Sequence, residues 1–185
     1  MKALLHTSSR TTRTTKQRGN SLLFVLLSLV IGGVVLAVGI SAYTDAEKSA
    51  SMQAVTGQVV QVIGGAKQSF GSYGYAGLTT AIAVGSRVIP PSTHVTATTA
   101  NNKYSGAITL VDNSLTTPGT ALLTYANVPA EECSGIVNGT QSLARQMAVA
   151  GTEVKPLDGQ INLATLNTQC ISAANVAITW TISRT

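Results

Sequence analysis

Apolar residues form one uninterrupted block near the start of the chain, from Leu22 to Ile40. The block carries no charge, and its only polar side chain is Ser28. At about 1.5 Å of rise per residue, a helix of this length measures about 28 Å, close to the thickness of a bilayer core. Because no polar face interrupts the block, we expect a membrane-spanning helix and not a helix buried in a globular core.

Helical spacing of apolar residues continues beyond this block. One stripe comprises Met52, Val55, Val59, Val62, Ala66 and Phe70, whereas Ser49, Ser51, Gln53, Gln58, Gln61 and Lys67 fall on other faces. The pattern predicts one long helix, with residues 20–43 as a transmembrane half and residues 44–70 as an amphipathic half that packs on a globular head. Gly32 and Gly33 lie in the first half and favour close packing between helices.

Residues 71–185 show strand-like alternation and two short helical patterns. The expected strands are Tyr104–Val111, Thr120–Asn127 and Asn175–Ser183, and the expected helices are Pro129–Val137, beginning at Pro129, and Asn162–Ile171, with Asn162 as its cap. Trp180 is expected in the core of the last strand, and Asn138-Gly139 is interpreted as a turn. The predicted fold class is α+β, a long N-terminal helix packed on an antiparallel β-sheet head.

Charge is distributed unevenly along the chain. The net charge of +5 comes from the five cations before Gly19, since the seven basic and seven acidic residues after it cancel. A neutral body gives no indication of nucleic-acid binding. Cations before the apolar block predict a cytoplasmic N-terminus and export of residues 43–185, where Cys133 and Cys170 favour a disulfide bond. No histidine or further cysteine accompanies them, so we expect no zinc site.

The junction Lys16-Gln17-Arg18-Gly19, followed at once by the apolar block, resembles the leader of a type IV prepilin. The resemblance implies that residues 1–19 are a cytoplasmic leader and that prepilin peptidase cuts between Gly19 and Asn20. In this family the new amine is often methylated. It also implies assembly through the helix, by Leu22, Leu23, Phe24, Val25, Gly32 and Gly33.

Two further features refine the resemblance. The helix is followed by Tyr75-Ala76-Gly77-Leu78 and Ile89-Pro90, and a C-terminal disulfide loop would join Cys133 to Cys170, as in the type IVb branch with its bundle-forming, toxin-coregulated and conjugative thin pili. Most pilins have Glu at the fifth mature position, where this chain has Phe24. That departure leaves open a minor pilin or a pseudopilin of a secretion system.

No residue pattern indicates an enzyme. His94 stands alone in a threonine-rich segment and is expected in solvent, and no nucleophile motif, phosphate-binding loop, metal site or cofactor site is recognised. The expected function is a structural subunit of a filament, with copies of itself, prepilin peptidase, the assembly machinery and the bacterial inner membrane as partners. The head would be exported and then extracellular. The alternative is an exported binding domain, anchored or secreted, that does not polymerise.

Overall fold

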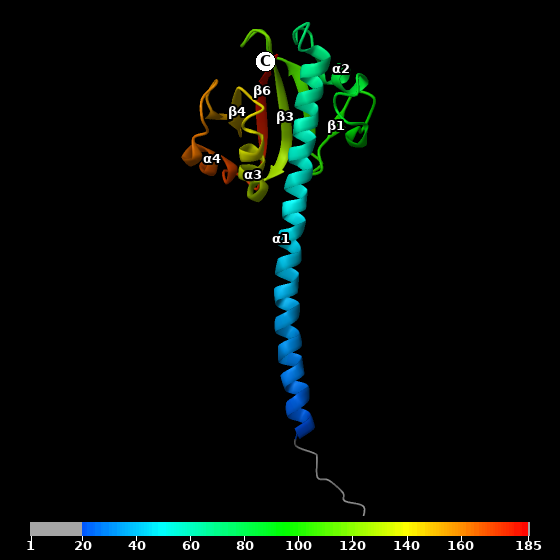
Figure 1. The fold of residues 1–185 in the computed structure, drawn as a ribbon, viewed down its shortest axis with the longest axis vertical. Coiled ribbons are helices and arrows are strands. Elements are labelled where there is room, and N and C mark those ends of the chain that lie inside the picture. The colour runs from blue at the N-terminus through cyan, green and yellow to red at the C-terminus, as the bar shows by residue number, and fades with distance from the viewer. Residues whose placement is uncertain (1–19, 185) are drawn as a thin grey trace, which may run out of the picture. The chain divides into compact units, whose positions relative to one another are not determined.

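The fold is described from a computed structural model. It describes the backbone of residues 20–184 and the side chains of residues 22–34 and 46–184. The chain divides into two compact units, Met1–Asp45 and Ala46–Thr185, and helix α1, Asn20–Phe70, extends from the first into the second (Figure 1). The expected leader, residues 1–19, lies outside the described residues.

In the first unit the structure describes a single element, the beginning of α1. Over the described residues, none of the helices is both long enough and apolar enough to span a bilayer. The predicted transmembrane segment, Leu22–Ile40, includes residues 35–40, whose side chains lie outside the described part of the chain.

The second unit contains a six-stranded sheet in the order β1-β2-β3-β6-β4-β5 (Figure 1). Every pair of neighbouring strands is antiparallel. The strands are β1 (Ala100–Asn101), β2 (Ala107–Asp112), β3 (Thr120–Pro129), β4 (Gln146–Val149), β5 (Thr152–Lys155) and β6 (Asn175–Ser183). The helices are α2 (Thr80–Gly85), the short η1 (Pro91–Thr93), α3 (Ala130–Thr140) and α4 (Leu163–Cys170). The α+β class and the antiparallel sheet are confirmed.

One face of the sheet forms the core together with the second half of α1. Strand alternation buries Leu110, Leu123, Tyr125, Ile178 and Trp180 on this face, where they share a hydrophobic cluster with the α1 stripe. Within the predicted stripe, Val55, Val59, Val62 and Ala66 are buried, and Met52 and Phe70 are partly buried against the cluster. The stripe is therefore confirmed for this part of the helix.

Trp180 lies in the core, as predicted. Its side chain is fully buried, and its ring meets that of Tyr125 edge to face with centroids 5.5 Å apart. The indole Nε1 donates a hydrogen bond of 2.9 Å to Thr140 Oγ1. A buried indole N–H needs such an acceptor, because an unpaired donor in the core lowers the stability of the fold.

Several local predictions were wrong. Asn138 and Gly139 belong to α3, not to a turn, and Pro129 ends β3 and caps α3 instead of opening its first turn. Tyr104 lies before β2, because the hydrogen bonds from Ser105 N to Asn102 O and from Asn102 N to Gly106 O close a tight turn there. The predicted cap is confirmed, since Asn162 Oδ1 accepts a bond of 3.1 Å from Thr165 N.

Candidate assembly site

The first candidate site is the run of apolar side chains at the start of α1. Every described large apolar residue of this run is exposed, and Phe24 and Leu29 each retain 70% of their accessible surface. The run comprises Leu22, Leu23, Phe24, Val25, Leu26, Leu27, Leu29, Val30, Ile31 and Val34. These residues follow one another around the helix, so the exposed surface is apolar on all sides.

This run has almost no hydrogen-bonding capacity of its own. The backbone N–H and C=O groups are hydrogen-bonded to one another within the helix. The hydroxyl of Ser28 donates a hydrogen bond of 2.9 Å to the carbonyl oxygen of Val25. An apolar surface of this extent is stable only when lipid or other apolar surfaces cover it. The site can therefore support association with like helices or with a bilayer, and it offers no group for acid–base chemistry.

Gly32 and Gly33 have open space beside them among the described residues. A Cβ atom added at either position would meet no atom within 4 Å. The pair therefore leaves a strip of bare backbone on the helix surface, where another helix can approach closely. Packing at these glycines in a filament stays a prediction, as do the assembly roles of Leu22, Leu23, Phe24 and Val25. The processing residue Gly19 and the side chain of Asn20 lie outside the described residues.

The second half of α1 is joined to the rest of the head by polar contacts. Lys48 forms an ion pair with Glu131 of α3, and the hydroxyl of the buried Ser51 accepts a hydrogen bond from Lys103 Nζ. Ser51 was placed off the apolar stripe, and it is nevertheless buried, because Lys103 reaches it from the turn before β2. The first contact joins residues 83 positions apart in the sequence, and the second joins residues 52 positions apart. A local sequence pattern therefore cannot predict either contact.

Close packing of α1 on α3 depends on small residues of α3. A Cβ atom at Gly135 would lie 2.0 Å from Met52 Sδ, and one at Gly139 would lie 3.2 Å from Thr56 Cγ2. Next to this contact, the buried Glu132 accepts a hydrogen bond from the hydroxyl of Tyr104. Burial, the hydrogen bond and the nearby negative charge together raise the pKa of Tyr104.

Cys133 and Cys170 form a disulfide, which confirms that prediction. Cys133 lies in α3 and Cys170 ends α4, with their Cα atoms 5.6 Å apart and both side chains buried. The bond closes a loop between cysteines 37 positions apart, and strands β4 and β5 lie within that loop. It therefore ties the far edge of the sheet to the helix that packs on α1.

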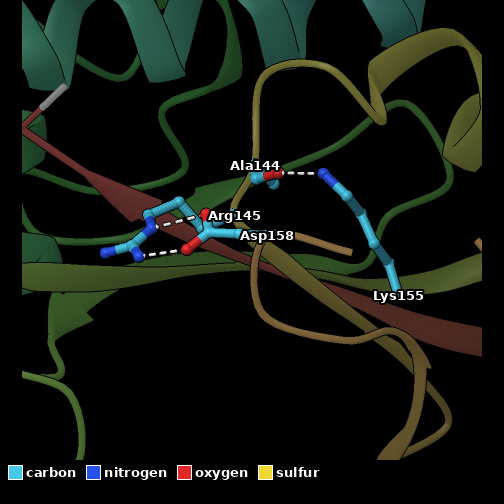
Figure 2. A network of polar contacts seen from close by, with 4 residues as sticks. All are labelled: Ala144, Arg145, Lys155 and Asp158. Carbon is cyan, nitrogen blue, oxygen red and sulfur yellow. Dashed lines mark hydrogen bonds and ion pairs between the residues drawn. The ribbon is translucent and has the colours of Figure 1, made fainter. Parts of the chain in front are cut away.

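A polar network holds the segment inside this loop (Figure 2). Arg145 Nε donates a hydrogen bond of 2.8 Å to Asp158 Oδ1, and Arg145 Nη2 donates a second one to the other carboxylate oxygen. This hydrogen-bonded pairing lowers the pKa of Asp158 and raises that of Arg145. Lys155 Nζ donates to the carbonyl oxygens of Ala144 and Gln141, which follow the end of α3. The network therefore holds the backbone of the segment after α3 in place. The charged side chains of Arg145, Lys155 and Asp158 all have partners within the network.

His94 is half-buried, so its predicted position in solvent was wrong. Its Nε2 lies within hydrogen-bonding distance, 2.8 Å, of the carbonyl oxygen of Ile89. This contact stabilises the loop after α2. Within the part of the chain that the structure describes, no group of three or more His, Cys, Asp or Glu side chains is arranged to hold a metal ion.

The fold and disulfide can now be compared with known proteins. A family model described as PilS N terminal matches residues 47–183. The chain belongs to the PilS N-terminal family. This family is related to type IV pilins, so the chain is pilin-like. The PilS match begins in α1 just after Asp45 and includes the whole sheet and both cysteines. A comparison with curated proteins found no match.

Proposed function

We propose that this protein is the structural subunit of a type IV pilus. Prepilin peptidase would remove residues 1–19, and the mature chain from Asn20 would polymerise into an extracellular filament used for adhesion, aggregation or conjugative contact. Before assembly, residues 20–43 would hold the subunit in the bacterial inner membrane with its head exported. The filament would be a helical homopolymer whose core is built from α1.

The observation that carries the proposal is the exposed apolar run of α1 in a chain of the PilS family. Leu22 to Val34 contain no charged side chain, and all the described large apolar residues among them are exposed. A bilayer covers such a surface before assembly, and a bundle of identical helices covers it afterwards. The leader precedes this run in the sequence, so its removal changes the charge of the N-terminus and leaves the apolar run intact.

The proposal can be tested by placing a charge in the run. Val30→Asp puts a carboxylate where the filament core is expected, and burying an unpaired charge is strongly unfavourable. We expect normal processing and a folded head but no fibres in the sheared cell-surface fraction. Leu115→Asp is the matched control, because Leu115 is fully exposed in the β2–β3 loop of the head. Fibres of normal yield from Val30→Asp would contradict the proposal.

Phe24 favours a second candidate, a minor pilin or pseudopilin. Most pilins pair a glutamate at this position with the N-terminal amine of a neighbouring subunit, and phenylalanine cannot provide that charge. A minor pilin needs only one or a few copies per fibre, so its abundance separates the two candidates. Near-stoichiometric recovery from purified fibres supports the major subunit, and trace recovery supports the second candidate.

The type IVb assignment is the finer part of the proposal. It rests on the segment Tyr75 to Leu78 after α1, the Ile89-Pro90 step, and the disulfide loop from Cys133 to Cys170. Methylation of the Asn20 amine belongs to the same proposal. Mass spectrometry of the mature N-terminal peptide tests it, because a methyl group adds a fixed mass to that peptide alone.

A further inference from the structure

The face of the sheet opposite the core carries a row of small, uncharged side chains. Thr109, Thr124, Thr179 and Ala148 stand in one in-register row across β2, β3, β6 and β4. The hydroxyls of Thr124 and Thr179 lie 3.2 Å apart, within hydrogen-bonding distance. A second row places Leu122 beside Thr181 and Thr181 beside Gln146. Because neighbouring residues of the same strands point into the core, these side chains point outward.

A groove of about 330 Å³ lies on this outer face. Leu122, Ala148 and Thr179 contribute to its lining from three adjacent strands, and the β2–β3 loop and the β4–β5 hairpin provide the remainder. The volume is near the lower end for small-ligand sites. The groove is distinct from the apolar run of α1 and from the Arg145–Asp158 network.

One end of the groove is a chain of polar groups. The hydroxyl of Thr181 lies 3.5 Å from Gln146 Oε1, and the amide nitrogen of Gln146 donates to a carboxylate oxygen of Glu153. The amide thus holds one oxygen of Glu153 in place, and the other keeps its accepting capacity. Oriented carboxylate and amide groups of this kind bind ligand hydroxyls that donate and accept.

The opposite end offers hydroxyl groups from the β2–β3 loop. Thr116 and Thr117 line the groove, and no hydrogen-bond partner for either side-chain hydroxyl is found among the described residues. Asn113 donates a hydrogen bond of 3.1 Å from Nδ2 to Thr120 Oγ1, and its side-chain Oδ1 keeps its accepting capacity. Both ends of the groove therefore combine donors with acceptors.

The charge of the lining excludes most other ligand classes. Among the described lining residues, Glu153 is the only ionisable side chain, and no Lys or Arg is present. Phosphate, sulfate and acidic sugars need a cation that this groove lacks. One carboxylate without companions is also a poor metal site. A neutral ligand rich in hydroxyl groups matches the lining best.

We propose that this groove binds a neutral saccharide. Hydroxyls of the sugar would bond to Glu153 and Gln146 at one end and to Thr116 and Thr117 at the other, over a floor that includes Leu122 and Ala148. Without an aromatic ring in the lining, affinity for a single unit is weak, on the order of 1 mM. The inference does not depend on filament formation, although repetition of the site along a fibre would raise the overall avidity.

The test uses the full chain in a polyoxyethylene detergent, since detergents with sugar headgroups would compete for the groove. Saturation-transfer NMR titrations would compare glucose, galactose, mannose and N-acetylglucosamine with the acidic N-acetylneuraminic acid. We expect saturable binding of at least one neutral sugar and weaker binding of the acidic one. The Thr116→Val and Thr117→Val double variant keeps the side-chain shapes, removes both hydroxyls, and should lower affinity about tenfold with an unchanged melting temperature.

Gln160→Ala is the matched control, because Gln160 lines a different groove beside Asp158. It should bind the sugar as the parent chain does. Glu153→Gln, which preserves the shape of the side chain, serves as the second variant should the double variant fold poorly, and it should also weaken binding. Absence of saturable binding by every neutral sugar would overturn the proposal. Preference for N-acetylneuraminic acid, or equal affinity in the parent, Thr116→Val/Thr117→Val and Glu153→Gln proteins, would overturn it as well.

Discussion

Gly106 lies where the backbone of the turn before β2 closely approaches the backbone of β3. A Cβ atom there would lie 1.9 Å from the carbonyl oxygen of Ala126, in the segment of β3 where the pairing register shifts. The same carbonyl accepts a bond of 2.7 Å from Asn102 Nδ2, and Asn102 Oδ1 accepts a bond of 3.0 Å from Gly106 N. The turn before β2 is therefore pressed against β3, and only glycine fits between them.

Gly106→Ala should lower the free energy of unfolding by at least about 2 kcal/mol, because backbone must move to relieve the overlap. Gly57→Ala is the matched control, since a Cβ atom at this helical position meets nothing within 4 Å. That change should raise stability by up to about 1 kcal/mol through helix propensity. Urea unfolding followed by Trp180 fluorescence measures both, and equal effects from the two variants would contradict the account.

The Arg145–Asp158 pair makes a prediction about pH. The pKa of Asp158 lies below its ordinary value of 3.8, because it accepts hydrogen bonds from Arg145 and feels the positive charge of that residue. A lowered carboxyl pKa stabilises the fold above the ordinary value, and this stabilisation is lost as pH falls through the folded-state value. The contribution should therefore be complete near neutral pH and disappear in acid.

Asp158→Asn should lower the melting temperature at pH 7, and its difference from the parent protein should shrink as pH falls below about 4. Arg145→Lys should give a smaller loss with the same pH dependence, since lysine cannot make the paired contact. Asp112, whose pKa is also lowered by hydrogen bonds from Ser114 and Gly77, keeps part of the acid dependence in every variant. A pH-independent difference for Asp158→Asn would contradict this prediction.

Single residues were predictable where a local pattern fixes them. Trp180 was assigned to the core because strand alternation places it with Ile178 and Ile182, and all three are fully buried. The burial of Ser51 was not foreseen and His94 was misplaced, because their partners, Lys103 and the carbonyl of Ile89, meet them only in the folded chain. Polar groups that gain a partner can be buried, and sequence periodicity does not reveal that partner.

Among the elements, long and strongly patterned ones were predictable and short ones were not. The α1 stripe, β3, β6, α3 and α4 all carry repeated apolar spacing, and each lies close to its predicted range. The two-residue β1 and the four-residue β4 and β5 are too short for alternation to stand out. The β4–β5 hairpin also turns through Ala150 and Gly151, both at positive φ. Of these two residues, only the glycine is a sequence signal for such a turn.

The Cys133–Cys170 bond joins two of these elements and makes a prediction at their scale. Closing a loop between cysteines 37 residues apart stabilises the fold by about 4 kcal/mol in the chain-entropy model. Cys170→Ser should therefore lower the melting temperature strongly and reduce the amount of subunit in the membrane. An unchanged melting curve, or two thiols that titrate in the native protein, would contradict the role given to this bond.

At the scale of the whole molecule, charge and apolarity are separated along the chain. The cations that give the net charge of +5 precede Gly19, the apolar run follows, and the remainder is neutral. A neutral head with one oriented apolar helix suits repeated side-by-side packing, since like subunits do not repel strongly. This separation was predictable from the sequence, whereas the outer-face groove was not, because residues of β3, β4, β5 and β6 and of two connecting segments form it only in the folded sheet.

The proposed pilus subunit starts at Asn20 after processing and forms fibres. The most direct measurement is the N-terminal sequence of the protein recovered from fibres sheared off the cell surface. We predict a start at Asn20 in this fraction, with the apolar run retained. A chain that starts at Met1 and stays in the membrane, or one that starts near Ile40 and is released without fibres, would contradict it.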